Sequence, residues 1–271
     1  MRPLFFILNG IAGLFLLSTQ VISQEQPELA QNHYLKVLTF NIFHGESYYS
    51  GNQDYESNLG IVADLINELD PDVVALQEVD CMTGRSRGVN LIVELARLTD
   101  MNPIFGKTMD FDGGEYGLGI LSDYSFLSTK ILPLTSGDAS EPRAVLESLF
   151  IIETGDTVRF ACTHLDHRDA NIRDQQAEDL NDIIRTDIFP SILAGDFNAG
   201  PESKTIEIIK KKWINSSPGN EPTSPSIDPR RKIDYIFFRP WEKWELVESR
   251  VIEEKRASDH NPVFTVIRIL E

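Results

Sequence analysis

Asp196 and Asn198 stand one residue apart, directly after a short apolar segment of the chain. Residues 191–194 predict a buried strand, and Gly195 lets the backbone turn there and approach a ligand closely. A carboxylate and a carboxamide at a strand end can hold a cation and orient an oxygen atom. The same spacing also suits a tight Asx turn, in which the Asp side chain binds a backbone amide.

A second segment, near the C-terminus, places Asp259 beside His260. It is followed at once by residues 262–269, an apolar and partly β-branched run that predicts a strand. Together with Asp196 and Asn198, these side chains supply two acids, an amide and an imidazole near strand ends. Metal-assisted hydrolysis of a phosphate ester requires such a set, because the acids hold a hard cation and the imidazole handles a proton or a developing negative charge.

Polar residues also follow two predicted strands in the first third of the chain. Asn41 ends the predicted strand of residues 35–41, and Glu78 directly follows the buried run of residues 72–77. A carboxylate at the end of a buried strand must be paired or bind a cation, so Glu78 is the first candidate for a metal ligand. Asn41 would orient a carboxylate, contact the metal through its oxygen, or simply form a turn.

His164 and Asp234 complete the set of strand-associated polar residues. His164 ends the predicted strand of residues 157–163, where a histidine could also do no more than cap the strand. Asp234 lies within the apolar run of residues 233–238. A carboxylate in such a strand is costly without a partner, so we expect Asp234 to have one.

The elements that must position these residues alternate between strands and amphipathic helices. Apolar residues recur with helical spacing in several segments, and we predict helices over residues 58–69, 89–98, 170–184 and 203–210. The remaining strands are predicted over residues 117–121, 145–152 and 246–252. Many strands with a few helices between them predict mixed α and β structure, with two stacked sheets and helices outside them.

In their order along the chain, these motifs resemble those of the endonuclease/exonuclease/phosphatase superfamily. That group includes pancreatic deoxyribonuclease, abasic-site endonucleases, neutral sphingomyelinases and inositol polyphosphate 5-phosphatases. The resemblance covers roughly residues 35–270. It implies an α+β fold, a four-layer α/β/β/α sandwich of two packed mixed sheets flanked by helices, with the site at one end of the paired sheets. It also implies a divalent cofactor, Mg²⁺ or Mn²⁺.

The resemblance gives each motif residue a role. Metal binding falls to Asn41, Glu78 and Asp259, the last as a ligand or as an aligning group. Asp196 would be the base or would position the attacking water, and Asn198 would contact the phosphate. The catalytic residues implied are His164, Asp196, Asn198, Asp234 and His260.

The resemblance implies a pairing of two of these catalytic residues, Asp234 and His260, and a third, His164, indicates which branch of the superfamily the chain resembles. His260 would face the scissile phosphate, and Asp234 would hydrogen-bond it, fix its tautomer and favour its charged form. His164 matches the second histidine of the deoxyribonuclease-like and sphingomyelinase-like branches. The abasic-site endonucleases have a tyrosine there, so the chain departs from that branch.

Substrate contacts are predicted from residues beside these motifs. Arg143, just before a predicted strand, is the favoured phosphate ligand because guanidinium matches phosphate geometry; Arg85 and Arg87 are further candidates. His44 would touch metal-bound water or substrate, or merely close a turn. Asp166 is a weaker candidate for a substrate contact.

The N-terminus has the pattern of a secretory signal. Residues 1–23 contain a short positive region, an apolar stretch and a site suited to cleavage before Gln24, although an uncleaved membrane anchor is the alternative. Residues 24–34 would be a short extension and residues 35–271 the catalytic domain. A secreted or periplasmic protein follows, without stable membrane insertion after cleavage. In that compartment Cys81 and Cys162 could pair, although their spacing cannot establish a bridge.

The charge of the chain bears on its substrate. The formal net charge is −17, and the longest basic run is residues 210–212. Polynucleotide binding depends on cationic side chains, so this excess of acids favours a small or lipid-derived phosphomonoester or phosphodiester as substrate over DNA or RNA. We also expect the protein to be a monomer. A secreted nuclease and a noncatalytic binding protein that keeps the fold are the alternatives. The sequence does not decide between one metal ion and two.

Overall fold

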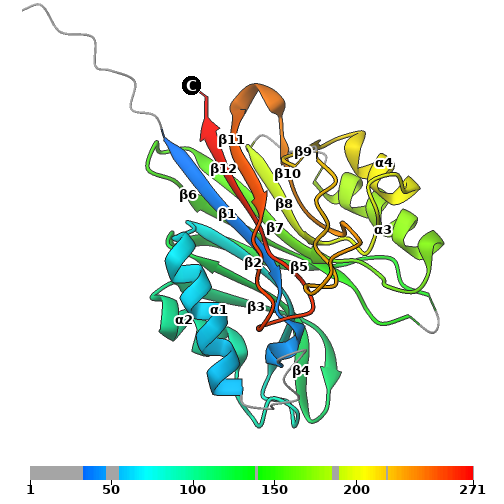
Figure 1. Ribbon diagram of the computed structural model, residues 1–271. Coiled ribbons are helices and arrows are strands. Elements are labelled where there is room, and N and C mark those ends of the chain that lie inside the picture. Colours follow the sequence, from blue (N-terminus) through cyan, green and yellow to red (C-terminus); the bar gives the residue numbers. More distant parts are fainter. Residues whose placement is uncertain (1–32, 47–54, 138–139, 185–188, 218, 271) are drawn as a thin grey trace, which may run out of the picture. The chain divides into compact units, whose positions relative to one another are not determined.

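In the computed structural model, the described residues form twelve strands in two sheets that pack face to face, with helices on both outer sides (Figure 1). The structure describes residues 33–46, 55–137, 140–184, 189–217 and 219–270. The signal sequence expected over residues 1–23 lies outside the described residues. Within the described ranges, no helix combines the length and the apolar composition that a membrane span needs.

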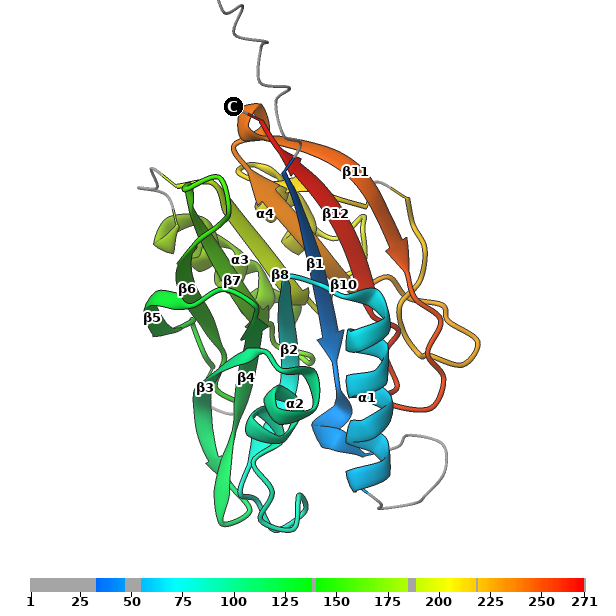
Figure 2. The ribbon, with the colours of Figure 1, turned by 90° about the vertical axis from the view of Figure 1, so that its left-hand side faces the viewer.

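The first sheet has a parallel pair of strands at its centre. β1 and β2 run parallel, α1 (Tyr55–Leu69) connects them, and all other neighbours in this sheet are antiparallel. Figure 2 shows β11, β12 and β1 running beside one another along this sheet. In spatial order the strands are β11 (Trp244–Val251), β12 (Val263–Ile269), β1 (Tyr34–Asn41), β2 (Val73–Cys81), β4 (Gly114–Ser122) and β3 (Asn102–Phe111).

The second sheet repeats this arrangement. β7 and β8 form its parallel pair, and α3 (Ala170–Ile183) connects them. The strands are β5 (Phe126–Pro133), β6 (Ala144–Ile151), β7 (Thr157–His164), β8 (Ser191–Asp196), β10 (Asp234–Arg239) and β9 (Ile214–Asn215), in that spatial order. The remaining helical elements are α2 (Leu91–Thr99), α4 (Lys204–Lys210), and the short turns η1 (Phe43–Gly45) and η2 (Trp241–Lys243).

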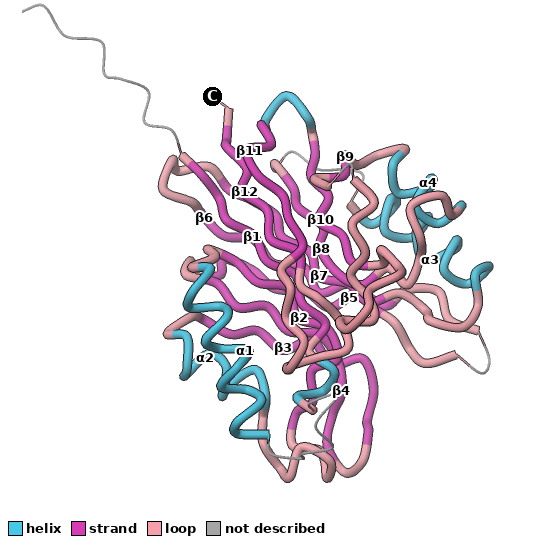
Figure 3. Tube along the Cα trace, in the orientation of Figure 1, coloured by secondary structure: helices cyan, strands magenta, loops and turns pink. Residues whose placement is uncertain are grey.

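Figure 3 shows the helices on the outer sides of the strands, and among the described residues three apolar clusters hold these layers together. The central cluster joins the inner faces of both sheets, with Val37 and Leu118 from one and Phe160 and Ile236 from the other. A second cluster packs α1 and α2 against the first sheet, and a third packs α3 and α4 against the second. The layers are therefore helix, sheet, sheet and helix, and the predicted four-layer α/β/β/α sandwich is confirmed.

The strands that the sequence did not predict all lie at sheet edges. β3, β5 and β9 are the outermost strands of their sheets, and β3 and β5 are mostly half-buried or exposed. Such strands lack the continuous apolar run that marks a buried one. A further difference concerns β2, which we expected to end at Gln77 but which continues to Cys81.

The two cysteines do not pair. Cys81 and Cys162 are both free, and the Cys162 thiol is buried between the strands. Its Sγ donates to the carbonyl of Leu76 and accepts from the side-chain amide of Gln77, each at 3.4 Å. The disulfide considered from the sequence is therefore absent.

The parallel pairs bring the motif residues together because parallel strands end at the same edge of a sheet. Asn41 stands beside Gln77 at the end of the first pair, and His164 beside Asp196 at the end of the second. Gly195 permits this second juxtaposition. A Cβ atom at Gly195 would lie 2.0 Å from the carbonyl oxygen of Thr163 on β7, so no larger residue fits without separating the strands.

Gly195→Ala should therefore destabilise the fold. We expect the free energy of unfolding to fall by at least about 2 kcal/mol, because the new methyl group meets backbone rather than a flexible side chain. Urea denaturation followed by circular dichroism measures this change. Gly60→Ala is the matched control, since Gly60 lies in α1 with nothing within 4 Å of its added Cβ, and it should stabilise the protein by about 1 kcal/mol. Equal stability of the Gly195 variant and the native protein would contradict the prediction.

Candidate active site

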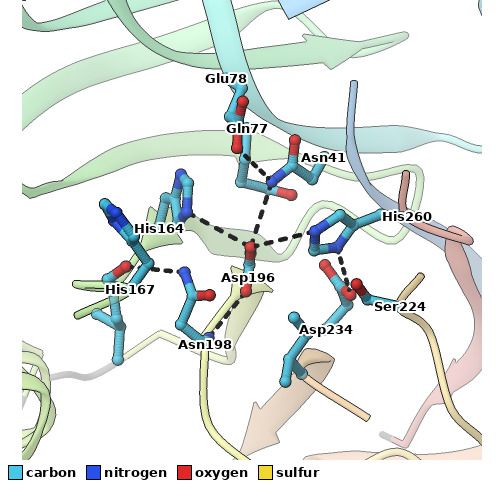
Figure 4. A network of polar contacts seen from close by, with 12 residues as sticks. Asn41, Gln77, Glu78, His164, His167, Asp196, Asn198, Ser224, Asp234 and His260 are labelled. Atoms are coloured by element: carbon cyan, nitrogen blue, oxygen red, sulfur yellow. Dashed lines mark hydrogen bonds and ion pairs between the residues drawn. The ribbon is translucent and has the colours of Figure 1, made fainter. Parts of the chain in front are cut away.

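Asp196 lies at the centre of a network of buried polar groups at the end of β8 (Figure 4). Its Oδ2 accepts a hydrogen bond from Nδ2 of Asn41 at 3.2 Å and lies 3.4 Å from Nε2 of His164. Its Oδ1 accepts from the backbone amide of Asn198 at 2.8 Å, which is the Asx turn anticipated from the spacing. Burial raises the pKa of Asp196 to about 7, and the nearby charge of Asp234 acts in the same direction.

His260 stands between two buried carboxylates. Its Nδ1 hydrogen-bonds Oδ2 of Asp234 at 2.9 Å, and its Nε2 faces Oδ2 of Asp196 at 3.8 Å. Burial alone would lower the pKa of His260, but the carboxylates of Asp234, Asp196 and Asp259 outweigh it and raise the pKa to about 10. The partner that we expected for Asp234 is thus His260, and the imidazole is held in its charged form at neutral pH.

His164 is held in the opposite state. Burial lowers its pKa well below the usual value, and the adjacent Arg143 guanidinium lowers it further. Nη1 of Arg143 lies 3.3 Å from Nδ1 of His164. Because a guanidinium can only donate, Nδ1 must accept, and the ring proton is therefore on Nε2, facing Asp196.

Glu78 reaches the site through a bulge in β2. The pairing with β4 shifts between Leu76 and Val79, so two residues of β2 stand opposite one residue of β4, and Glu78 adopts a left-handed backbone with φ of 57°. The sequence placed Glu78 after the strand end; the structure places it within the strand, where the bulge turns its side chain toward the site.

The surroundings of Glu78 favour its charged form. Burial acts to raise its pKa, but the hydrogen bonds with His44 and with the amide of Asn41, together with the charge of His260, hold the pKa well below the usual range. Asn41 donates from Nδ2 to Glu78 at 3.0 Å, while its Oδ1 accepts from the backbone amide of Phe43. His44 lies between Glu78 and Glu46, 3.4 and 3.3 Å from their carboxylates.

Two groups of residues have the chemistry of a metal site. Ligand atoms of Asp196, Asp234 and His260 lie within 4.8 Å of one another, and this buried group could bind a metal ion. Glu78 and Asp259 line the same pocket and offer only oxygen atoms. Burial raises the pKa of Asp259, and the charge of Glu78 raises it further. The two carboxylates thus repel each other across the pocket, which is the situation that a divalent cation relieves.

The network opens into a pocket of about 390 Å³. Most of the residues predicted to form the site line it: His44, Glu78, Arg143, His164, Asp196, Asn198, Asp259 and His260. Asn41 and Asp234 lie behind this surface and hold Asp196 and His260. Asp166 does not line the pocket; its Oδ1 accepts from the backbone amides of Arg168 and Asp169, so it shapes the loop that carries His167.

The sequence did not indicate several residues that complete the site. Oγ1 of Thr223 donates to Oδ2 of Asp234 at 2.5 Å, and Oγ of Ser258 donates to the carbonyl of Asn41 at 2.6 Å. Thr223 lies in a loop without periodicity, so no pattern marks it. The other unpredicted lining residues are Met109, Phe111, Tyr116, Glu141, Arg231 and Ile233.

Arg85, a candidate phosphate ligand, forms one wall of the pocket. Asp80 binds its guanidinium through both oxygens, at 2.7 and 2.8 Å. The same guanidinium lies over the ring of Phe111, 4.4 Å from its centroid, and beside Tyr116. A buried carboxylate therefore balances the charge of Arg85, while the other candidate, Arg87, does not line the pocket.

Comparison with known proteins identifies one family. The sequence model of the Endonuclease/Exonuclease/phosphatase family matches residues 38–260. That range contains every residue described above as lining the pocket or supporting it. No curated protein sequence matches the chain.

Solved structures with the same architecture come from bacteria and from human. A family protein from Bacteroides thetaiotaomicron has a TM-score of 0.75 and 19% identity over 89% of this chain and 100% of its own. A mannosyl-6-phosphatase of the same species has a TM-score of 0.71 and 20% identity, over 88% and 100%. The catalytic domain of human Nocturnin has a TM-score of 0.69 and 18% identity, over 88% and 98%. At these identities the likeness is one of fold.

The charged state of His260 can be measured directly. We expect its imidazole to remain protonated well above neutral pH, because the carboxylate of Asp234 stabilises the charge. Asp234→Asn should move the midpoint of the His260 titration downward by at least about one pH unit. NMR titration of the imidazole resonances measures this midpoint, and the chain has only 5 histidines. Asp110→Asn, at an exposed acid, is the control. A midpoint near 6.5 for His260 in the native protein would refute the assignment.

Proposed function

The chain belongs to the Endonuclease/Exonuclease/phosphatase family, and on that basis we propose that it is a divalent-metal-dependent phosphoesterase acting on a small phosphate ester. The observation that carries the proposal is the opposite charge states of two histidines around one carboxylate. Asp196 has a charged imidazole on one side, at His260, and a neutral one on the other, at His164. Phosphoryl transfer can use both states, because a charged imidazole stabilises developing negative charge and a neutral imidazole donates a hydrogen bond.

Glu78 and Asp259 are the residues that would hold the metal ion, Mg²⁺ or Mn²⁺. Both offer carboxylate oxygens to the pocket, and hard divalent cations prefer such ligands. In the alternative group of Asp196, Asp234 and His260, the atoms that face one another already make hydrogen bonds within the protein. When bound, a divalent ion polarises a phosphoryl oxygen and stabilises the leaving alkoxide. Asn41 would fix Glu78 for this task through its amide.

Asp196 is the residue proposed to take a proton from the attacking water. A carboxylate whose pKa is raised toward neutrality is a better base near pH 7 than one with the usual value. The charged His260 would then stabilise the negative charge that develops on the phosphoryl group. His164 would donate from Nε2, because Arg143 occupies its other nitrogen.

The charges of the pocket support a small substrate. Carboxylates balance two of its arginines, since Arg85 pairs with Asp80 and Arg143 pairs with Glu141 at 2.8 Å. A polynucleotide needs several uncompensated cationic contacts along its backbone. The similarity of fold to a mannosyl-6-phosphatase agrees with a small phosphate ester as substrate. A nuclease is the less favoured proposal, and a noncatalytic protein is disfavoured because each motif residue is retained.

The N-terminal pattern supports a secreted or periplasmic location. Residues 1–23 would direct export and be removed. The remaining chain would consist of a short extension, residues 24–34, and the catalytic domain, residues 35–271, without stable membrane insertion. We propose a monomer. The carboxyl-rich surface indicated by the net charge of −17 keeps such a protein soluble.

The first test of the function is hydrolysis by the purified protein. A panel of phosphomonoesters, phosphodiesters, sphingomyelin and plasmid DNA should contain at least one substrate that is turned over with Mg²⁺ or Mn²⁺ and not in excess chelator. Asp196→Asn should reduce turnover by about 100-fold or more, because it removes the base and keeps the shape. Asp70→Asn, at an exposed acid that does not line the pocket, should leave turnover unchanged. Full activity of the Asp196 variant would reveal a different site or a contaminating enzyme.

The second test concerns the class of substrate. We expect kcat/KM for the best small phosphoester to exceed that for plasmid DNA at least about tenfold at physiological salt, because duplex DNA finds too few free cationic groups. Steady-state kinetics on both substrates in one buffer give the ratio. A clear preference for DNA would place the protein among secreted nucleases instead.

A further inference from the structure

A basic cluster lies where β7 leads into α3, at one side of the pocket. It consists of Arg143, His167 and Arg168, and the term basic cluster refers to these three residues below. Nη2 of Arg143 lies 3.2 Å from Nδ1 of His167, and Nε of Arg168 lies 3.0 Å from Nε2 of the same ring. Both nitrogens of His167 therefore face a guanidinium group.

His167 cannot accept a hydrogen bond from both guanidinium groups at once. A neutral imidazole has one acceptor nitrogen, a charged imidazole has none, and guanidinium groups only donate. At least one of the two contacts therefore sets an N–H group against another N–H group. An anion placed among the three side chains would accept hydrogen bonds from all of them and would remove this mismatch.

Among the described residues, the basic cluster makes only one ion pair with an acid. In the described part of the chain, neither His167 nor Arg168 has an acid at ion-pair distance among the ion pairs of the structure, and Arg143 has only Glu141. Asp166, the acid next to His167, directs Oδ1 to two backbone amides. Arg143 is 4% exposed, and its Nε is buried without a hydrogen-bond partner.

The position of the basic cluster connects it to the reaction centre. Arg143 and His167 both line the pocket, and Arg143 contacts His164, which contacts Asp196. His167 is exposed in the pocket, and the exposed Arg168 contacts it from outside the pocket lining, so a ligand that extends past His167 would meet Arg168. An anion bound here would therefore lie one side chain away from the phosphate that reacts.

We propose that Arg143, His167 and Arg168 form a second anion subsite, which binds a phosphate or carboxylate group of the substrate beside the scissile phosphoester. This proposal rests on the function proposed above and narrows its substrate class to small phosphoesters that carry a second negative group. His167 and Arg168 would then determine specificity, while Arg143 would serve both the subsite and His164. Glu141, which pairs with Arg143, would be displaced or would bind a hydroxyl of the same substrate.

Isothermal titration calorimetry can test the subsite separately from catalysis. The Asp196→Asn protein with saturating Mg²⁺ would be titrated with glucose 6-phosphate, glucose 1,6-bisphosphate and 6-phosphogluconate. The first ligand carries one anionic group, and the other two add a phosphate or a carboxylate. We expect at least one of the doubly anionic ligands to bind about tenfold more tightly than glucose 6-phosphate, since paired charge-assisted hydrogen bonds are of that strength.

Variants in the same background show whether the basic cluster causes this difference. Arg168→Gln and His167→Gln should each remove most of the preference and leave glucose 6-phosphate binding within about twofold of its original value. Both side chains are exposed, so the variants should fold, and thermal denaturation verifies this. Arg97→Gln on α2 removes the same charge from an exposed arginine and should preserve the preference.

Two results would overturn the proposal. Equal affinity for all three ligands would show that no second anion is bound. A loss of affinity of equal size for every ligand, caused by Arg168→Gln or His167→Gln, would mean that the cluster binds the scissile phosphate itself. Failure of the hydrolysis panel would count against the proposed function and leave these binding results unaffected.

Discussion

Burial of two carboxylates at the junction of the sheets is the constraint on which this structure depends. Asp196 and Asp234 are each about 1% exposed, and they lie close enough that the charge of Asp234 raises the pKa of Asp196. An unpaired buried charge is strongly destabilising, so both need compensation inside the protein. His260 supplies a positive charge between them, and Asn41 and Thr223 supply hydrogen bonds. Removal of any one of these groups takes a compensating contact away from a buried carboxylate.

This constraint explains the protonation states of the other polar groups in the site. With His260 charged, a second charged imidazole at His164 would add repulsion in a buried place, and Arg143 would increase it. His164 is therefore neutral, and its proton is directed to Asp196. Glu78 and Asp259 lie nearer to solvent, where a cation can reach them. The site therefore contains an inner set of charged groups that neutralise one another within the protein. Its outer groups are acidic, and ligands can reach them.

The sequence predicted most of the strands that carry the motifs, because buried strands leave continuous apolar runs and their polar ends stand out. It also predicted the layers and the grouping of Asn41, Glu78, Asp196 and His260 at one end of the sheets. The bulge at Glu78 could not be predicted, because it is a property of the register with β4 and not of β2 alone. Edge strands such as β5 were not predicted, because their partly exposed positions accept polar residues and leave no continuous apolar run. The role of each site residue in catalysis stays a prediction.

The bond between Ser258 and Asn41 joins residues 217 positions apart in the chain, and that between Asn41 and Asp196 spans 155 positions. β12, which follows Ser258, also pairs with β1, so the last strand completes the sheet that the first one begins. A ribosome must therefore release the chain as far as Ser258 before both contacts can form. Contacts of such long range slow folding. During synthesis, β1 is an unpaired strand edge on that side until β12 arrives, and this interval is when the chain most needs protection from aggregation.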